Sequence, residues 1–439
     1  MEDALLIKGG KPLVGEVSLS GAKNSALKLL IATLLFDNKV TLNHIPDIAD
    51  IRELIHLLEQ LGAKVTFSNN TVEVDPTTVN SNRVDLLHAS KIRASFLLFA
   101  PLLYKFQKAI IPNPGGCRLG ARSIDRVVEG LKSLGIKLDY DSTTGYYTSE
   151  MNQKPHGSYT FEKSSHTATE LLIMMSVFGE GTIRIENAAQ EPEIDDLIRF
   201  LNEGGAKIKR DNKNILVEGV TALHQEKPYK IASDRVEALT YAVAGIATKG
   251  DVTISEISEE FIRPFLNVLE KMGAGVEKKS EQSWRFFYKE MKALTVETSP
   301  HPGFLTDWQP LMALLMTQAN GESIIHERIF ENRFSYVEEL RRLGATIEFI
   351  DYPVDNPKEH YFFNHDSEKP YEQTIKITGP QNLHGGVMEV ADLRAGATLA
   401  IAALIADGES FVKNVHHMDR GYEDFVGKIK KLGGEIRKL

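Results

Sequence analysis

Apolar and polar positions follow a pattern that recurs six times along the chain. In each copy, apolar residues spaced three and four apart run up to a glycine, and a short β-branched segment follows. This predicts an amphipathic helix and then a strand. The six segments are LEQLGAKV, LKSLGIKL, LNEGGAKI, LEKMGAGV, LRRLGATI and IKKLGGEI. Glycine suits the helix end because it adopts left-handed backbone conformations easily. These glycines, which recur roughly every 70 residues, are Gly62, Gly135, Gly205, Gly273, Gly344 and Gly433.

A second predicted helix precedes each of these segments, and it is apolar over most of its surface. A helix without a polar face is expected to lie inside a domain. The six stretches are SGAKNSALKLLIATLL, ASKIRASFLLFAPLL, SSHTATELLIMMSVF, SDRVEALTYAVAGIA, LTDWQPLMALLMTQA and ADLRAGATLAIAALIA. Each unit therefore reads as strand, buried helix, strand, amphipathic helix and strand. The pattern predicts an α/β fold of two similar globules, each built from three such units.

The length of 439 residues also favours two domains over one core. We place the first three-unit globule at residues 23–232 and the second at residues 1–22 and 233–439. The N-terminal strands, within residues 5–20, are expected to return and complete the second globule. Charged helix starts occur in both halves, so we expect the active site in the cleft between the globules. The polar stretch 351–373 lengthens the last interval and is expected to be a surface excursion.

Composition narrows the functional classes. A net charge of -9 argues against a general surface for nucleic acid or anionic membranes. No apolar run reaches the roughly 18 residues that a membrane-spanning helix needs. The single cysteine excludes an internal disulfide and fits a reducing cytoplasm. The acidic N-terminus does not resemble a secretory signal.

Known cofactor motifs are missing from the sequence. It has no phosphate-binding loop of the ATPase type, and its glycines do not follow the dinucleotide-binding pattern. One cysteine cannot build a cysteine zinc site or an iron–sulfur cluster, and the pair His416-His417 has no third ligand at a suitable spacing. We therefore expect no metal, no organic cofactor and no obligate protein partner.

The starts of the buried helices carry charged residues. A helix N-terminus has unpaired N–H groups and a positive dipole end, so it favours anions. Cations there are unfavourable unless something negative shares the site, and Lys23, Arg93 and Arg394 are such cations. They indicate an anionic ligand. Three other residues at these starts are explained equally well as helix caps. They are Ser165, Asp234 and Asp307.

Several connecting loops hold residues that packing does not require. The loop NPGGCRLGAR places Cys117 among glycines and two arginines, which would favour its thiolate. The alternative is a small hydrophobic residue that happens to be cysteine. Other loops present Glu191, Arg333 and Arg420, each of which taken alone could be a solvated surface charge.

The motifs SGAKNSA, RASF, PGGCRLGAR, NAAQEPEI, TDWQ, FENRF, DLRAGA and HMDRGYE, in this order, resemble the UDP-N-acetylglucosamine 1-carboxyvinyltransferase family. The resemblance spans nearly the whole chain. It implies a pair of inside-out α/β globules. It also implies transfer of enolpyruvyl from phosphoenolpyruvate to the 3-hydroxyl of UDP-N-acetylglucosamine with release of phosphate, the first committed step of peptidoglycan synthesis. The related enzyme that uses shikimate 3-phosphate lacks the cysteine loop.

The resemblance implies roles for individual residues. Cys117 would donate a proton to carbon 3 of the donor and be alkylated by fosfomycin, and Asp307 would face the acceptor hydroxyl as a general base. Lys23 and Arg394 would also be catalytic, and Glu191 and Arg333 would support the site. The implied phosphoenolpyruvate-binding residues are Lys23, Asn24, Arg122, Arg394 and Arg420. The implied UDP-sugar-binding residues are Arg93, Arg122, Ser123, Ile124, Asp125, Arg126, Lys163, Ser164, Ser165, His166, Asp307 and Ile329.

Three places depart from the usual family pattern. Ser123 replaces a proline, His166-Thr167 replaces a Val-Gly pair, and Trp308 replaces a methionine beside the presumed base. All are expected on the acceptor side of the cleft. An enolpyruvyl transferase acting on a different nucleotide or UDP-sugar acceptor is therefore the alternative. A catalytically silent binding protein is a third possibility, but it would not need an opposed thiol and carboxylate.

Overall fold

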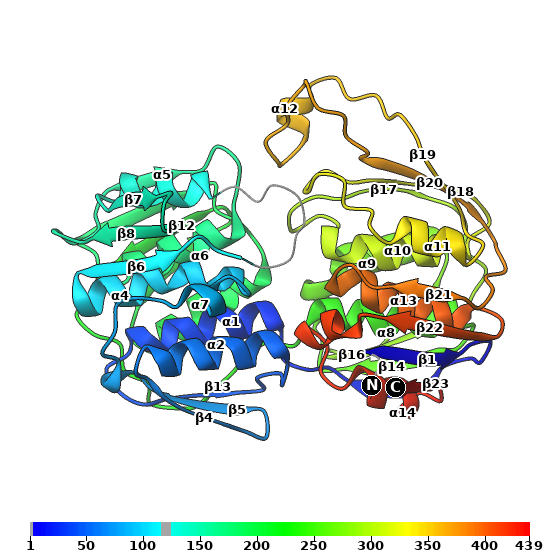
Figure 1. Cartoon of the computed structure of the whole chain (residues 1–439), viewed down its shortest axis with the longest axis horizontal. Coiled ribbons are helices and arrows are strands. Elements are labelled where there is room, and N and C mark those ends of the chain that lie inside the picture. Colours follow the sequence, from blue (N-terminus) through cyan, green and yellow to red (C-terminus); the bar gives the residue numbers. More distant parts are fainter. Residues whose placement is uncertain (1–2, 116–123) are drawn as a thin grey trace. The chain divides into compact units, whose positions relative to one another are not determined.

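The computed structural model describes residues 3–115 and 124–439, which divide into two compact units. We call residues 3–20 and 233–439 the terminal unit and residues 21–115 and 124–232 the inserted unit. Each unit contains three small sheets together with buried and amphipathic helices (Figure 1). The predicted α/β fold class is confirmed.

The terminal unit has sheets ordered β15-β16-β14-β2, β17-β18-β20-β19 and β21-β22-β1-β23. Its strands are β1 (Ala4–Lys8), β2 (Val14–Ser18), β14 (Asp251–Ser255), β15 (Gly275–Ser280), β16 (Ser283–Phe287), β17 (Thr295–Glu297), β18 (Gly321–His326), β19 (Thr346–Phe349), β20 (Thr374–Gly379), β21 (Val387–Glu389), β22 (Glu409–Lys413) and β23 (Glu435–Lys438). Its helices are α8 (Arg235–Ala247), α9 (Glu259–Met272), η4 (Thr306–Trp308), α10 (Gln309–Met316), α11 (Val337–Arg342), α12 (Pro357–His360), α13 (Leu393–Ile405), η5 (Val415–Arg420) and α14 (Phe425–Lys431).

The inserted unit has sheets ordered β13-β3-β5-β4, β6-β8-β7 and β11-β12-β10-β9. Its strands are β3 (Val40–Asn43), β4 (Lys64–Ser68), β5 (Thr71–Asp75), β6 (Lys108–Pro112), β7 (Lys137–Asp141), β8 (Tyr146–Glu150), β9 (Ser158–Thr160), β10 (Thr182–Glu186), β11 (Lys207–Asp211), β12 (Asn214–Glu218) and β13 (Tyr229–Lys230). Its helices are α1 (Lys23–Ala32), η1 (Thr33–Leu35), α2 (Ala49–Gln60), η2 (Pro76–Thr78), α3 (Leu86–Ala89), η3 (Arg93–Leu98), α4 (Phe99–Phe106), α5 (Asp125–Ser133), α6 (His166–Ser176) and α7 (Pro192–Glu203).

Three of the six repeats share one connection. A short strand leads into a buried helix, and the strand after the helix pairs with the first in parallel, as in β9–β10, β17–β18 and β21–β22. In the sheet of β6, β7 and β8, the parallel strand pair is replaced by a single isolated bridge between Arg83 and Ile110. The predicted return of the N-terminal strands is confirmed, because β2 pairs with β14 and β1 lies between β22 and β23.

The predicted repeat lacks one strand that the structure contains. In four copies the strand after the amphipathic helix turns back as a hairpin, in β4–β5, β7–β8, β11–β12 and β15–β16. The β4–β5 turn consists of Asn69 and Asn70, both with positive φ, which is the chemistry of a tight hairpin turn. In the last copy, β1 takes the place of the second hairpin strand.

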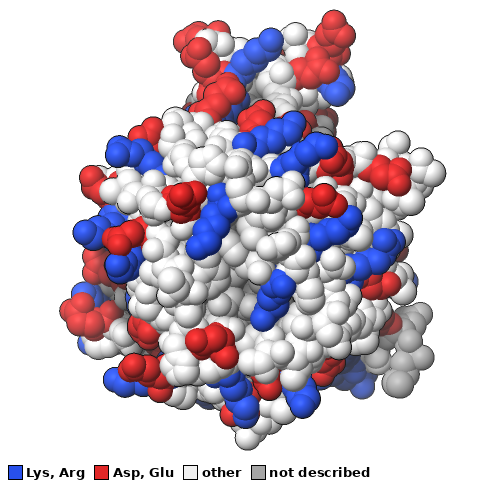
Figure 2. Space-filling view, turned by 90° about the vertical axis from the view of Figure 1, so that its left-hand side faces the viewer, with Lys and Arg blue, Asp and Glu red and all other residues white. Residues whose placement is uncertain are grey.

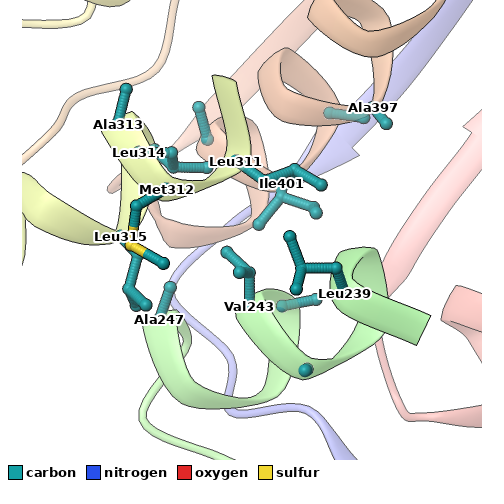
Figure 3. Packing of buried hydrophobic residues seen from close by; sticks show 14 of the residues in the cluster. Leu239, Val243, Ala247, Leu311, Met312, Ala313, Leu314, Leu315, Ala397 and Ile401 are labelled. Atoms are coloured by element: carbon teal, nitrogen blue, oxygen red, sulfur yellow. The ribbon is translucent and has the colours of Figure 1, made fainter. Parts of the chain in front are cut away.

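The core of the terminal unit is built from its three buried helices. Figure 3 shows Leu239 and Val243 of α8 and Ile401 of α13 pointing toward the apolar side chains of α10. All 13 residues of α8 are buried. The prediction that the helices without a polar face form the core is therefore confirmed here.

The excursion 351–373 is more than a solvated loop. It runs from β19 to β20 and includes α12, and Figure 1 shows it standing away from the sheets. Yet Tyr361 and Phe363 are buried, and His360 Nε2 lies 3.0 Å from Nε2 of His326 in β18. Burial and the neighbouring His360 lower the pKa of His326 to about 4. The excursion thus packs its own aromatic cluster against the sheet.

The surface carries charges of both signs. On the face drawn in Figure 2 they lie scattered among uncharged residues, with no continuous basic area. That face offers no extended surface to a polyanion. Among the described helices, none is long and apolar enough to cross a membrane.

A buried ion pair between α8 and α14 also binds the backbone just after β2. Glu237 in the first turn of α8 is 2% exposed, and its carboxylate binds Lys428 Nζ at 2.5 Å and the backbone N–H of Ser20 at 2.6 Å. Burial raises the pKa of Glu237, although Lys428 opposes that shift. The carboxylate therefore depends on Lys428 of α14 for its charge balance.

The substitution Lys428→Met should lower the free energy of unfolding by about 3–5 kcal/mol, because it leaves the buried Glu237 without its cation. The loss should shrink as the pH falls, because Glu237, whose pKa is already raised, then takes up a proton in the folded state. Denaturant unfolding at two pH values measures both effects. Lys430→Met, at an exposed position of the same helix, is the control. An equal loss in both variants would show that Glu237 does not depend on Lys428.

Candidate functional site

The terminal unit brings Asp307, Arg333 and Arg394 together. Asp307 Oδ1 accepts a hydrogen bond from Arg333 Nη2 at 2.7 Å, and its Oδ2 lies 3.3 Å from both Nε and Nη2 of Arg394. The two arginine side chains are 4% and 6% exposed, whereas that of Asp307 is 27% exposed. The carboxylate is thus the solvent-facing part of a buried charge cluster.

This cluster makes Asp307 a weak base as it stands. Burial alone would raise the pKa of Asp307, but the guanidinium groups of Arg333 and Arg394 lower it well below its ordinary value. The same carboxylate, acting against burial, raises the pKa of Arg394. A group that draws one arginine away would therefore restore basicity to Asp307.

Arg394 is held from several sides. Its guanidinium lies over the ring of Tyr422, with Cζ 5.7 Å from the ring centroid. Its backbone N–H donates to Asp392 Oδ1 at 3.0 Å, and Asp392 thereby caps α13. Arg420, at the end of η5, is partly buried.

The structure shows which of the three candidate cap residues cap a helix. Asp234 Oδ1 accepts from the backbone N–H groups of Val236 and Glu237 at 2.7 and 3.0 Å, so it caps α8. Ser165 caps α6 through the N–H of Ala168 at 3.4 Å. Asp307 makes no cap of this kind, and its carboxylate faces the two arginines instead.

The inserted unit balances Lys23 with a carboxylate. Lys23 begins α1 and is buried, and its Nζ lies 2.6 Å from Oδ2 of Asp50, which stands in the first turn of α2. Asn24 follows it and is partly exposed. The cation at this helix start therefore has an anionic partner within the protein, one that a bound anion could replace.

Two further cations of the inserted unit are Lys163, just before α6, and Arg126, in the first turn of α5. Burial and the positive charge of Arg126 lower the pKa of Lys163. Ser164 leads from Lys163 to the cap residue Ser165, and all three are partly exposed. A cation beside a helix N-terminus favours an anionic ligand.

Other predicted residues lie on nearby elements of the same unit. Arg93 begins η3, and Ile124 and Asp125 stand at the start of α5. Arg93 and Ile124 are partly exposed and Asp125 is exposed. Ile329 belongs to the terminal unit, where its backbone N–H donates to Glu327 Oε1 at 2.7 Å.

His166 is tied to a buried carboxylate. Its Nε2 lies 3.0 Å from Oε1 of Glu170, which also lies 2.8 Å from Nζ of Lys28 and is fully buried. Burial opposes protonation of His166, but Glu170 outweighs it and raises the pKa of the imidazole. The carboxylate of Glu191 acts in the same direction.

The expectation that Trp308 lies on the acceptor side of the cleft is wrong. Trp308 is fully buried in the core of the terminal unit, with its ring centroid 5.5 Å from that of Phe304 and 6.1 Å from that of Phe265. Successive side chains of a 3₁₀ turn point about 120° apart. Trp308 therefore faces inward while its neighbour Asp307 faces solvent.

Three predicted residues, Cys117, Arg122 and Ser123, lie outside the described residues. Among the described residues, no group of three His, Cys, Asp or Glu side chains is arranged to hold a metal ion. His416, considered above as a metal ligand, binds the carboxylate of Asp3 through both its ring and its backbone N–H.

Sequence reasoning missed the partners of the predicted residues. Asp50 pairs with Lys23, and Glu170 pairs with His166. Thr306 accepts a hydrogen bond from Arg333 and donates one to Glu327. Of these partners, only Asp50 could be recognised from the local sequence, because an acidic residue is favoured in the first turn of a helix. The others gain their meaning from contacts between distant segments.

Known proteins are similar in sequence to this chain over nearly its whole length. The sequence profile of the family described as EPSP synthase (3-phosphoshikimate 1-carboxyvinyltransferase) matches residues 7–429. The chain is 38% identical over 437 residues to the "UDP-N-acetylglucosamine 1-carboxyvinyltransferase" of Halothermothrix orenii, with 99% of each chain covered. It is 38% identical over 440 residues to the protein of that name from Idiomarina loihiensis, covering 100% of this chain and 99% of the relative.

Solved structures agree on the fold. The enolpyruvyl transferase NikO from Streptomyces tendae aligns with a TM-score of 0.85 at 22% identity, over 99% of this chain and 98% of that chain. EPSP synthase from Acinetobacter baumannii aligns with a TM-score of 0.73 at 14% identity, over 99% of each chain. These likenesses confirm the predicted enolpyruvyl transferase fold.

Trp308→Ala should lower the free energy of unfolding by about 3–5 kcal/mol, because it empties a fully packed core position. Trp308→Phe keeps most of the ring volume and loses no hydrogen bond, since the indole Nε1 has no partner among the described residues. Its cost should be below about 1.5 kcal/mol. Denaturant unfolding of both variants measures the difference. A Trp308→Ala protein of unchanged stability would show that the side chain does not lie in the core.

Proposed function

We propose residue roles for this chain, which belongs to the EPSP synthase family and, within it, to the UDP-N-acetylglucosamine 1-carboxyvinyltransferases. The enzyme transfers the enolpyruvyl group of phosphoenolpyruvate to the 3-hydroxyl of UDP-N-acetylglucosamine and releases phosphate. This is the first committed step of peptidoglycan synthesis. The observation that carries the proposal is the partly exposed carboxylate of Asp307 held by two buried arginines.

The reaction is an addition followed by an elimination. In the addition, the acceptor oxygen bonds to carbon 2 of phosphoenolpyruvate, the hydroxyl proton passes to a base, and carbon 3 gains a proton. In the elimination, carbon 3 loses a proton and the bond from carbon 2 to the phosphate oxygen breaks. The products are the enolpyruvyl ether and phosphate.

Asp307 is the proposed general base for the acceptor hydroxyl, and Cys117 the proposed donor of the proton to carbon 3. Arg394 has two roles in this scheme, because it pairs with Asp307 and is also a proposed ligand of the donor. When Arg394 turns to the donor's carboxylate or phosphate, Asp307 loses part of the field that lowers its pKa. Donor binding would thereby strengthen the base when it is needed.

The donor is a small trianion, and five residues are proposed to bind it: Lys23, Asn24, Arg122, Arg394 and Arg420. Arginine suits this task because its planar fork pairs with two oxygens at once. Lys23 would exchange Asp50 for the donor's negative charge. These residues come from both units, so we propose that both are needed for activity.

The acceptor diphosphate is proposed to lie at the start of α6, with Lys163 and Arg126 as its cationic ligands. Arg93, Ile124 and Asp125 would contact the nucleotide sugar from the same unit. The remaining proposed acceptor contacts are Arg122, Ser123, Ser164, Ser165, His166, Asp307 and Ile329. Glu191 and Arg333 support the site through His166 and Asp307.

The alternative of a different acceptor loses one of its supports. Trp308, one of the substitutions that motivated it, lies in the core. His166 is bound to Glu170 and stands at the start of α6. The nucleotide-sugar substrate and the single cysteine support a cytoplasmic location.

The test of the proposed function is phosphate release from phosphoenolpyruvate in the presence of UDP-N-acetylglucosamine. We expect one phosphate per enolpyruvyl product, identified by mass spectrometry, and no release without acceptor. Activity only with another nucleotide sugar would support the alternative acceptor. Tight UDP-sugar binding without turnover of any acceptor would point to a binding protein.

Asp307→Asn should reduce kcat by about 10²–10⁴-fold, because the amide cannot take the hydroxyl proton. The Michaelis constant for UDP-N-acetylglucosamine should change much less than kcat. Steady-state kinetics measures both. Asp419→Asn, at an exposed residue paired with Lys438, is the control and should retain activity. Full activity of Asp307→Asn would exclude Asp307 as the base.

Fosfomycin should inactivate the enzyme by alkylating Cys117, because the arginines in the surrounding motif favour the reactive thiolate as long as the trianionic donor, which favours the protonated thiol, is not bound. Mass spectrometry should locate one adduct on the peptide that contains Cys117. Cys117→Ser is the matched control and should give no adduct. An unmodified wild-type protein after treatment would refute the prediction.

A further inference from the structure

A second carboxylate, Glu327, lies behind the Asp307 cluster. It follows β18 and is fully buried. Its Oε1 accepts hydrogen bonds from the backbone N–H groups of Ile329 and Phe330 at 2.7 and 3.1 Å, and its Oε2 accepts from Thr306 Oγ1 at 2.8 Å. Three donors on one carboxylate favour its ionised form.

Thr306 links this carboxylate to Arg333. Arg333 Nη1 donates to Thr306 Oγ1 at 2.7 Å, while its Nη2 donates to Asp307 Oδ1 at 2.7 Å. Because Thr306 Oγ1 already accepts a hydrogen bond from Arg333, its own O–H donates to Glu327. One guanidinium is thus held between two carboxylates, and only Asp307 reaches solvent.

The loop that carries this arrangement is clamped from the base of the excursion. Gln373 is 5% exposed, and its Nε2 donates to the carbonyl oxygens of Glu327 and Phe330 at 2.7 and 3.0 Å. Its Oε1 accepts from the N–H of Asn332 at 2.7 Å. Asn332 has a positive φ of 50°, so this loop is held in a defined conformation directly before Arg333.

The charges around the cluster fix the direction of the effect. Arg333 faces the carboxylates of Asp307, Glu327 and Asp392, and Asp307 faces Arg333 and Arg394. Burial raises the pKa of Glu327, while Arg333 and the three donors oppose that shift. A negative charge on Glu327 offsets part of the positive field of Arg333. Its loss would leave that field to act on Asp307 and make Asp307 a weaker base.

We propose that Glu327 is a positioning residue that sets the base strength of Asp307 through Thr306 and Arg333. The inference rests on the proposed function, in which Asp307 takes the proton of the acceptor hydroxyl. Glu327 itself touches no substrate. It acts on the rate through the orientation of Arg333 and through charge.

The substitution Glu327→Gln keeps the shape and removes the charge. We expect kcat to fall by roughly 10-fold, with both Michaelis constants within about 2-fold of wild type. The acidic limb of the kcat against pH profile should move to lower pH, because a weaker base is deprotonated at lower pH. Glu327→Asp, which keeps the charge, should recover part of the loss.

A second pair of variants keeps the test sharp if the buried Glu327→Gln substitution impairs folding. Thr306→Val removes the bridging hydroxyl and leaves the Glu327 charge in place, and Thr306→Ser restores the hydroxyl. We expect Thr306→Val to lower kcat and Thr306→Ser to recover most of it. Binding of UDP-N-acetylglucosamine, measured by calorimetry, identifies variants that remain folded.

The outcomes separate the two proposals. A wild-type protein without enolpyruvyl transfer would defeat the proposed function itself. An active wild type alongside a folded Glu327→Gln variant with the same kcat and pH profile would defeat only the inference about Glu327. A rise in the Michaelis constants with kcat unchanged would also overturn it, because that pattern indicates lost binding rather than a weaker base.

Discussion

The structure of the proposed site depends on one shared carboxylate. Asp307 stands between Arg333 and Arg394, whose side chains are almost entirely buried. Two buried guanidinium groups repel each other, and Asp307, which contacts both, offsets that repulsion. The same contacts lower its pKa and suppress its basicity. In the proposed mechanism the anionic donor removes this suppression by taking Arg394.

The repeated fold explains how such charges reach buried helix starts. Each repeat surrounds a largely apolar helix with strands and an amphipathic helix, and the charged side chains of α1, α6, α8 and α13 lie within the first two turns of these helices. Lys23 and Arg394 occupy such first turns in different units, and both pair with a carboxylate from another element of the same unit. These carboxylates balance the cations within the protein and are the groups that a bound anion would displace.

The repeat and the buried helices could be predicted from the sequence because they rest on local periodicity and on glycine at helix ends. The hairpin strands were missed because short strands joined by two residues, such as Asn69-Asn70, add little to the pattern. The site residues came from the family motifs, but their partners did not. Glu327 and Gln373 are 46 residues apart and acquire a role only when β18 and β20 pair. Trp308 was misplaced because adjacent residues of a 3₁₀ turn point in different directions.

The sharing of one carboxylate can be tested by measuring the pKa of Asp307 directly. Carboxyl carbon NMR of protein labelled at aspartate, with an Asp307→Asn spectrum for assignment, would follow its titration with and without phosphoenolpyruvate. We predict that Asp307 titrates below the ordinary aspartate value of 3.8 in the protein alone. We also predict that its pKa rises when the donor binds. An ordinary pKa in the free protein, or one that the donor leaves unchanged, would contradict the claim that Arg394 is shared between Asp307 and the donor.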